Sequence, residues 1–177
     1  ALACPKVLVH RDLNPRYIRE CDVSKSVNWF DRLLVPGESS PFGSASHAVR
    51  TAPWLIRDAH ELLSPFEARR VLDVESDTLP VVAVIGSGRA QEVEQMDRLA
   101  GRLASEFGSR AAVRFVALRA RNVVERGRPP ENAGRISNLW PFLQAIRGVS
   151  VSVGNGGYNT VHEARVTQTP LVALARP

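Results

Sequence analysis

The chain has 177 residues, of which 44% are apolar and 23% are charged, and it carries a formal net charge of +5. This composition is typical of a globular protein with a sizeable core and argues against a disordered chain. The surplus charge comes from arginines spread along the sequence, with no basic stretch interleaved with aromatic residues. We therefore expect no nucleic acid partner and favour a small phosphorylated ligand.

The two cysteines, Cys4 and Cys21, have no partner cysteines and no nearby histidine pair at metal-ligand spacing. We therefore expect no metal site, no disulfide framework and a reducing, cytoplasmic location. No apolar run approaches the roughly 20 residues that span a bilayer, and the first residues lack the pattern of a signal peptide. Because the sequence has no initial methionine and begins and ends on apolar strands, we expect it to be truncated at both ends.

The N-terminal part of the chain predicts the end of one domain followed by a linker. Short apolar runs at residues 5–10 and 33–35 are typical of buried strands, and the mixed segment 17–30 between them permits a helix. Residues 37–57 are rich in serine, glycine and proline, which indicates a linker or a long loop. The predicted domains are residues 1–57 and residues 58–177.

From residue 58 onward, strands and helices alternate. Ser64-Pro65-Phe66-Glu67 combines a capping serine, an early proline and a glutamate at the capping-box position, which indicates a helix start. We expect strands at 81–85, 113–118, 135–139, 149–153 and 171–174, and helices at 64–72, 93–107, 141–147 and 159–167. All of these strands except 135–139 are apolar enough to be covered on both faces. The order predicts an α/β fold built on a Rossmann-like parallel sheet.

The most informative segment is a glycine turn, Gly154-Asn155-Gly156-Gly157-Tyr158-Asn159-Thr160, between the strand at 149–153 and the next helix. Glycines let a diphosphate approach the backbone, and the unpaired N–H groups and dipole of the helix start favour negative charge. Thr160 could donate a hydroxyl, and Glu163 could accept hydrogen bonds from a ribose. The glycine spacing alone fits equally a tight strand-to-helix connection with a surface glutamate.

Gly156-Gly157-Tyr158-Asn159-Thr160 with Glu163, followed by Thr169-Pro170 and an apolar strand, resembles the donor-site signature of GT-B glycosyltransferases. The resemblance is strongest to the bacterial branch, glycosyltransferase family 28, related to the enzyme that adds N-acetylglucosamine to lipid-linked muramyl-pentapeptide. UDP-glucuronosyl and plant UDP-glycosyl transferases are more distant.

Three further segments support this resemblance. Residues 30–37 resemble the closing helix and strand of the family's acceptor domain, and Gly86-Ser87-Gly88 resembles the first loop of its donor domain. Trp140-Pro141 resembles the aromatic-proline pair shortly before the donor turn. The fold that this implies is a GT-B donor domain preceded by the last elements of the acceptor domain and a linker.

The resemblance implies that amides of Gly156 to Thr160 hold the donor diphosphate and that Glu163 holds the ribose. Backbone groups of Asn138, Leu139 and Trp140 would read the base, and Gly86, Ser87, Gly88 and Asn155 would complete the nucleotide-sugar site. The implied reaction is the inverting transfer of a hexosyl group from a UDP-linked sugar to an acceptor that the sequence does not identify.

The implied reaction uses no cofactor, because helix-end amides can neutralise the leaving diphosphate without a metal. The catalytic base would come from outside the chain, and we expect the piece itself to be inactive. The resemblance allows peripheral membrane association of the full-length protein, and exposed strand edges favour self-association of the piece.

Two positions depart from the family's pattern. Asn155 stands where plant-like members have a histidine that contacts phosphate, and Gln168 stands where a glycine is usual. The pair of residues that contacts the sugar would lie beyond Pro177, so the sugar cannot be read from this chain.

Two other functions remain open. Gly86-Ser87-Gly88 is common to nucleotide-binding α/β folds, but Gln91 occupies the sixth position of a dinucleotide motif. Arg119 and Arg121 follow the next strand in place of an acidic residue, so a site of this kind would be of the NADP type. The second alternative is a non-catalytic nucleotide-binding or regulatory module that keeps the glycine turn.

His10-Arg11-Asp12-Leu13-Asn14-Pro15 is similar to the start of a protein kinase catalytic loop, but Tyr17 replaces the required asparagine and no DFG motif follows. A better interpretation places His10 and Asp12 at the carboxyl end of a strand, where either side chain could face the acceptor and take part in catalysis. The alternative is a solvent-facing turn.

Overall fold

The computed structural model describes residues 4–10, 15–37, 42, 44–118 and 130–174. Within it the chain forms two compact units, Ala1–Trp54 and Leu55–Pro177, each with its own sheet.

The first unit holds a parallel sheet in the order β1-β2-β3, made of β1 (Val7–Val9), β2 (Arg32–Pro36) and β3 (Ala48–Thr51). Two short helices and a 3₁₀ turn, α1 (Pro15–Glu20), α2 (Val23–Ser26) and η1 (Val27–Trp29), connect β1 to β2. Val27, Leu33 and Val35 are buried together in a small core.

The strand β3 corrects the sequence prediction, which assigned residues 37–57 to a linker or loop. Four residues of that segment pair in parallel with β2, and the register joins Leu33 to Ala48 and Pro36 to Thr51. A run of four residues is too short to show a strand periodicity of its own. The strand exists because β2 offers an edge with unpaired backbone groups.

The second unit is a five-stranded sheet in which every neighbouring pair is parallel, in the order β6-β5-β4-β7-β8. The predicted Rossmann-like α/β fold is confirmed. The strands are β4 (Val81–Gly86), β5 (Ala112–Ala117), β6 (Ala133–Ser137), β7 (Val151–Asn155) and β8 (Leu171–Leu174). From β4, the chain adds β5 and β6 on one side of the sheet and then β7 and β8 on the other side. The direction in which strands are added therefore reverses between β4 and β7.

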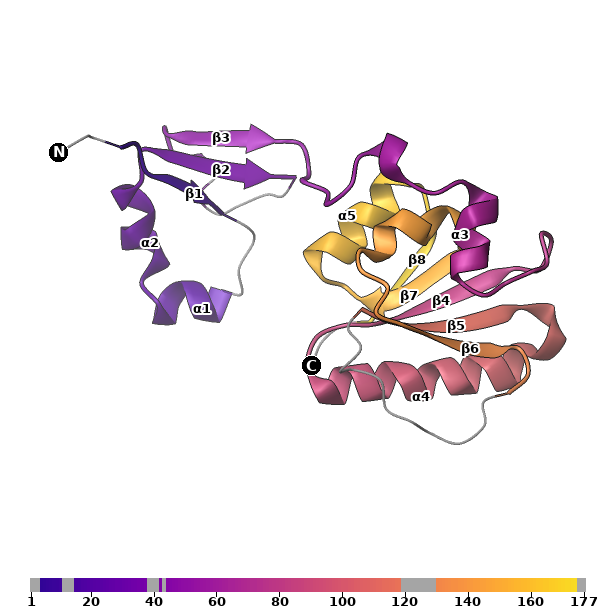
Figure 1. The fold of residues 1–177 in the computed structure, drawn as a ribbon. Helices are drawn as coiled ribbons and strands as arrows, with labels where there is room; N and C mark the ends of the chain where they lie inside the picture. Colours follow the sequence, from indigo (N-terminus) through magenta and orange to yellow (C-terminus); the bar gives the residue numbers. More distant parts are fainter. Residues whose placement is uncertain (1–3, 11–14, 38–41, 43, 119–129, 175–177) are drawn as a thin grey trace. The chain divides into compact units, whose positions relative to one another are not determined.

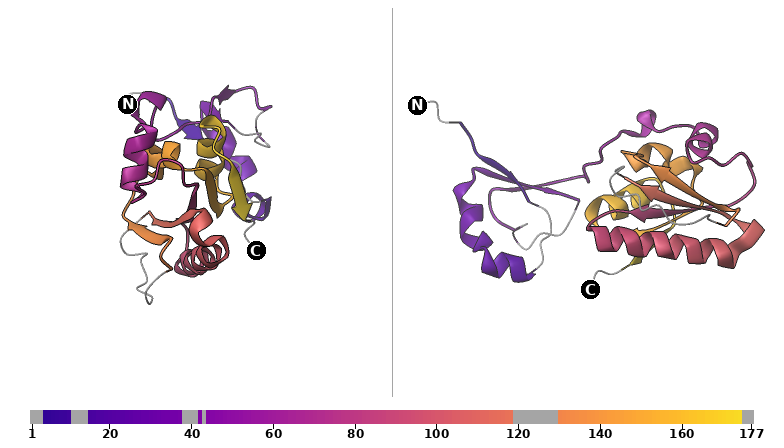
Figure 2. Two further views of the ribbon diagram at one scale, coloured as in Figure 1. Left: turned by 90° about the vertical axis from the view of Figure 1, so that its right-hand side faces the viewer. Right: turned by 60° about the horizontal axis from the view of Figure 1, so that its bottom comes forward.

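Helices cover both faces of this sheet (Figures 1 and 2). The long helix α4 (Ala90–Phe107) packs on one face, where Val93 and Met96 join Val82 and Val84 in one core. The other face carries α3 (Pro65–Val71), the 3₁₀ segment η5 (Phe142–Gly148) and α5 (Tyr158–Val166). The remaining 3₁₀ turns are η2 (Ala59–Glu61) and η3 (Gly108–Arg110).

Local signals explain several of these boundaries. Ser64 Oγ accepts the Glu67 N–H at 3.3 Å and Glu67 Oε2 accepts the Ser64 N–H at 3.0 Å, so α3 begins with the predicted capping box. Gly108 ends α4 with a φ of +52°, a left-handed conformation that favours glycine. The helix predicted at 141–147 is instead the 3₁₀ segment η5.

One burial prediction is wrong. All residues of β4 and β5 are buried, but Val172 in β8 is 51% exposed because β8 is an edge strand of the described sheet. None of the helices in the part of the chain that the structure describes is both long and apolar enough to cross a lipid bilayer.

Gly101 lies in the middle of α4, and a Cβ added there would meet nothing within 4 Å. We expect Gly101→Ala to raise the free energy of unfolding by about 0.5 to 1 kcal/mol, because alanine restricts the unfolded backbone and favours the helix. Urea denaturation measures this change.

Gly148 is the matched control, since a Cβ there would lie 2.9 Å from backbone atoms of Ala68 and Arg69. Gly148→Ala should lower the stability. If both substitutions changed stability in the same direction, the packing described for these two positions would be wrong.

Candidate functional site

The candidate site lies where the strand order reverses. β4 and β7 are direct neighbours, with Val84 in register with Val153, so their carboxyl ends and the loops that follow reach the same edge of the sheet. In open α/β sheets this switch point is where ligands bind. Both glycine-containing segments, 86–88 at the end of β4 and 154–157 at the end of β7, meet here.

A side-chain hydrogen bond joins the two loops. Asn155 Nδ2 donates to the backbone oxygen of Ser87 at 3.2 Å, and the Asn155 side chain is buried. The Asn155 side chain therefore connects the two loops. Plant-like members of the resembled family have a phosphate-contacting histidine at this position. In the first loop, Gly88 has a φ of +98°, so a side chain there would be strained.

The start of α5 offers backbone donors to an anion. The N–H groups of Asn159 and Thr160 have no hydrogen-bond partner among the residues that the structure describes. By contrast, Gly156 N–H donates to Leu174 O at 3.3 Å and Gly157 N–H donates to Asn155 O at 2.7 Å. The amides available to a diphosphate are therefore those of the first helical turn rather than those of the two glycines.

Gly157 is the N-cap of α5, and no side chain caps the helix there. Its φ of −76° is open to any residue, and an added Cβ would meet nothing within 4 Å. The backbone therefore does not require glycine at this position. What glycine provides is open space in front of the helix start.

Glu163 lies on α5 and is half-buried. Burial raises the pKa of its carboxyl group to about 7. No hydrogen bond or ion pair to this carboxyl group occurs among the described residues, although the Glu163 backbone oxygen accepts from Thr167 Oγ1 at 2.7 Å. A desolvated carboxyl group without a partner, on the helix that starts the site, is typical of a functional residue.

The segment predicted to read the base follows β6 at the same edge of the sheet. Leu139 is buried in the core, so only its backbone can face a ligand, whereas Asn138 and Trp140 are exposed. Asn138 adopts a left-handed φ of +58°, and Trp140 N–H donates back to Asn138 O at 3.2 Å. Trp140 is 54% exposed.

The departure at Gln168 has a structural correlate. Its φ is +56°, in the left-handed region that favours glycine. Glycine is also the usual residue at this position in the family that the sequence resembles. Gln168 therefore keeps a glycine-type backbone conformation with a non-glycine side chain.

The structure describes His10 but not Asp12. His10 follows β1 and is 3% exposed, with its ring edge-on to Phe42 at a centroid distance of 5.1 Å. The alternative of a solvent-facing turn is therefore wrong for His10. Asp12 lies outside the described residues, as do Arg119 and Arg121, on which the NADP-type alternative depends.

Sequence reasoning missed Arg89. This residue directly follows Gly88 and is the N-cap of α4, a position that usually holds serine, threonine, aspartate or asparagine. A positive charge at a helix start opposes the helix dipole, so it is locally unfavourable. The side chain is exposed, and the backbone N–H of Arg89 donates to Glu92 Oε2 at 2.7 Å. The signal in the sequence was an arginine next to a glycine loop at the start of an amphipathic helix.

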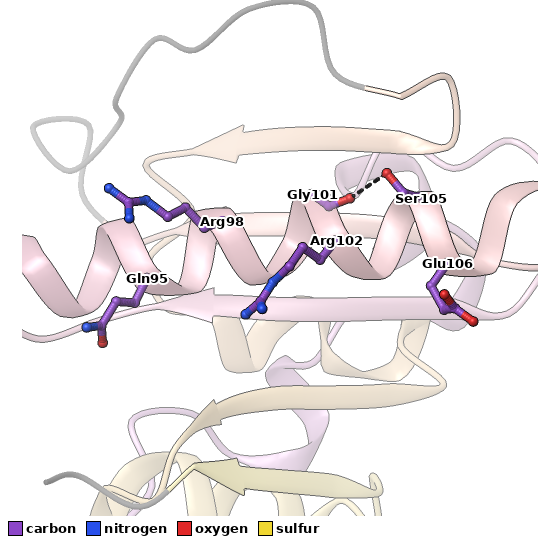
Figure 3. Close-up of a pocket in the computed structure, with 6 residues that line it drawn as sticks. All are labelled: Gln95, Arg98, Gly101, Arg102, Ser105 and Glu106. Atoms are coloured by element: carbon purple, nitrogen blue, oxygen red, sulfur yellow. Dashed lines mark hydrogen bonds between the residues drawn. The ribbon is translucent and has the colours of Figure 1, made fainter.

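A hollow of about 970 Å³ lies over α4 (Figure 3). Its described lining comes from one solvent-facing stripe of that helix: Gln95, Arg98, Gly101, Arg102, Ser105 and Glu106. Ser105 Oγ donates to Gly101 O at 3.1 Å within the stripe. Because the described lining comes from a single helix face, whereas two loops and a helix start meet at the switch point, we place the candidate site at the switch point. The described residues contain no cluster of three or more His, Cys, Asp or Glu side chains that could hold a metal ion.

No protein-family model and no curated protein matches the chain. Solved structures do. The crystal structure of the glycosyltransferase of kitacinnamycin is similar over 92% of this chain and 42% of that chain, with 19% sequence identity and a TM-score of 0.57. The glycosyltransferase SnogD from Streptomyces nogalater is similar over 97% of this chain and 57% of that chain, with 14% identity and a TM-score of 0.47.

The first of these similarities shows the fold, which is that of a glycosyltransferase of the GT-B type. The chain spans less than half the length of that structure and little more than half the length of the second.

The raised pKa of Glu163 links this residue to stability. The carboxyl group titrates at a higher pH in the folded chain than its ordinary value of 4.5, so folding is disfavoured progressively as pH rises from about 4.5 through 7. We expect Glu163→Gln to change stability little near pH 4 and to stabilise the chain by about 1 to 2 kcal/mol at pH 8, a value reduced for partial exposure. Urea denaturation across this pH range measures the difference.

Glu106→Gln, at an exposed position on α4, controls for the loss of one carboxyl group. An effect of Glu163→Gln that stayed the same from pH 4 to pH 8 would show that the carboxyl group is not desolvated.

Proposed function

We propose that the chain is the nucleotide-sugar-binding part of a glycosyltransferase that transfers a hexosyl group from a UDP-linked sugar to an acceptor. The observation that carries this proposal is the combination of two features on α5. The helix starts at the switch point with unpaired N–H groups of Asn159 and Thr160, and it continues to the unpartnered carboxyl group of Glu163. The fold similarity to a glycosyltransferase supports the same function.

The spacing along α5 suits a nucleoside diphosphate. With a rise of about 1.5 Å per residue, Glu163 lies about 4.5 to 6 Å beyond Asn159 and Thr160 along the helix axis. A diphosphate at the helix start then leaves its ribose beside Glu163, whose carboxylate accepts hydrogen bonds from the ribose hydroxyls. The base extends toward the exposed residues Asn138 and Trp140 at the same edge of the sheet.

In the proposed transfer, a bond forms between an acceptor oxygen and the anomeric carbon as the bond from that carbon to the donor diphosphate breaks. Negative charge develops on the leaving diphosphate. The amides and dipole of α5 stabilise this charge, and the guanidinium of Arg89 adds a positive charge from the first loop. The acceptor hydroxyl gives its proton to a base that the described residues do not identify.

We expect Glu163→Ala to weaken UDP binding by about 1 to 3 kcal/mol at pH 8, because a charged acceptor of the ribose hydroxyls is lost. The loss should be smaller for dUDP, whose ribose lacks the 2′ hydroxyl. Isothermal titration calorimetry measures the affinities for UDP and dUDP. Equal UDP affinity of Glu163→Ala and the unmodified chain would contradict the ribose assignment. Tighter binding of NADP⁺ than of UDP to the unmodified chain would favour the dinucleotide alternative.

The role of Arg89 has a separate test. Arg89→Gln should weaken UDP binding about 3- to 10-fold at low salt while leaving uridine binding unchanged, because the proposed role of the guanidinium is to attract the charge of the diphosphate, which uridine lacks. Arg165→Gln, an exposed arginine later on α5, should change neither affinity. A UDP affinity that is the same in Arg89→Gln as in the unmodified chain would remove Arg89 from the site.

A further inference from the structure

A second cavity of about 220 Å³ lies within the second unit. Three stretches that are far apart in the sequence line it: the segment leading into η2, the residues of η5 and the end of α5. Its lining residues are Leu55, Arg57, Ala59, Leu62, Leu143, Arg147, Val166 and Thr167. η5 ends just before β7 begins and α5 ends just before β8 begins, so this cavity lies at the amino ends of these strands. It is therefore at the opposite edge of the sheet from the glycine loops.

The cavity divides into an apolar part and a cationic part. Leu143 is buried, and Leu55 and Leu62 are half-buried against the core of this sheet face. Arg57 and Arg147 add two guanidinium groups, and Arg147 is exposed while the Arg57 side chain is 39% exposed. The charges thus stand toward solvent and the leucines toward the interior.

Both guanidinium groups keep hydrogen-bonding capacity. Arg147 Nη2 donates to the backbone oxygen of Ala59 at 3.1 Å, and the guanidinium makes no other hydrogen bond among the described residues. Arg57 Nη1 donates to Ile56 O at 3.2 Å, and Arg57 Nε forms an ion pair with Glu61 Oε1 at 3.9 Å, a distance too long for a hydrogen bond. Each arginine carries five N–H donors, so most of them are available to an anion.

We propose that this cavity binds a small carboxylate with a short apolar body, with the carboxylate between Arg57 and Arg147 and the apolar body against Leu62 and Leu143. Planar guanidinium groups match the geometry of a carboxylate and bind it through paired hydrogen bonds. The volume is below the roughly 300 to 1,000 Å³ of sites for drug-sized ligands, so the ligand is small. This site is independent of the nucleotide site proposed above.

Sodium hexanoate is a suitable probe, because it combines a carboxylate with a five-carbon apolar tail. Titrated into the ¹⁵N-labelled full chain at constant ionic strength, it should give saturable amide shifts at Ala59, Leu62, Leu143 and Val166. Acetate, which lacks the apolar body, and hexanol, which lacks the charge, should each bind at least fivefold more weakly.

Arg147→Gln should weaken hexanoate binding at least fivefold, and Arg165→Gln is the matched control, an exposed arginine on α5 outside the cavity. Arg57→Gln gives a second test should Arg147→Gln fail to fold, since the partners of the Arg57 guanidinium among the described residues, Ile56 and Glu61, are both close to it in the sequence. Equal affinity for hexanoate and acetate, equal affinity for hexanoate and hexanol, or unchanged affinity in the folded arginine variant would each overturn the proposal.

Discussion

The parallel pairing of β4 with β7 is the constraint on which the candidate site depends. These two strands are consecutive in space but separate in sequence, and their register brings the loop after Gly86 and the turn after Asn155 to one edge of the sheet. The bond from Asn155 Nδ2 to Ser87 O then fixes one loop against the other. A shift in this register would separate the first loop from the start of α5 and remove the site.

The electrostatics of α5 follow from this placement. Its first turn presents unpaired N–H groups and the positive end of the helix dipole, whereas Glu163 is desolvated further along and has a pKa of about 7. An unpaired, half-buried carboxyl group costs stability in the folded chain. Such a cost is common at binding sites, where the ligand supplies the missing partners.

Local signals made much of the second unit predictable. The capping residues Ser64 and Glu67, the apolar run of β4 and the glycine that ends α4 each have a short-range physical cause that a sequence displays. Features that depend on neighbours in space were missed or wrong. The strand β3 exists because β2 pairs with it, β8 is exposed because of its edge position, and the raised pKa of Glu163 arises from packing. The sequence identified the glycine turn, but only the structure shows which of its amides are available to bind an anion.

We propose that a nucleoside diphosphate binds where the loops after β4 and β7 meet. Amide chemical shifts of the ¹⁵N-labelled chain, recorded during a titration with UDP, test it most directly. We expect saturable shifts at Ser87, Gly88, Asn159, Thr160 and Glu163, with unchanged amide shifts along the exposed stripe of α4. Saturable shifts confined to the α4 stripe, or no saturable shift at α5, would contradict it.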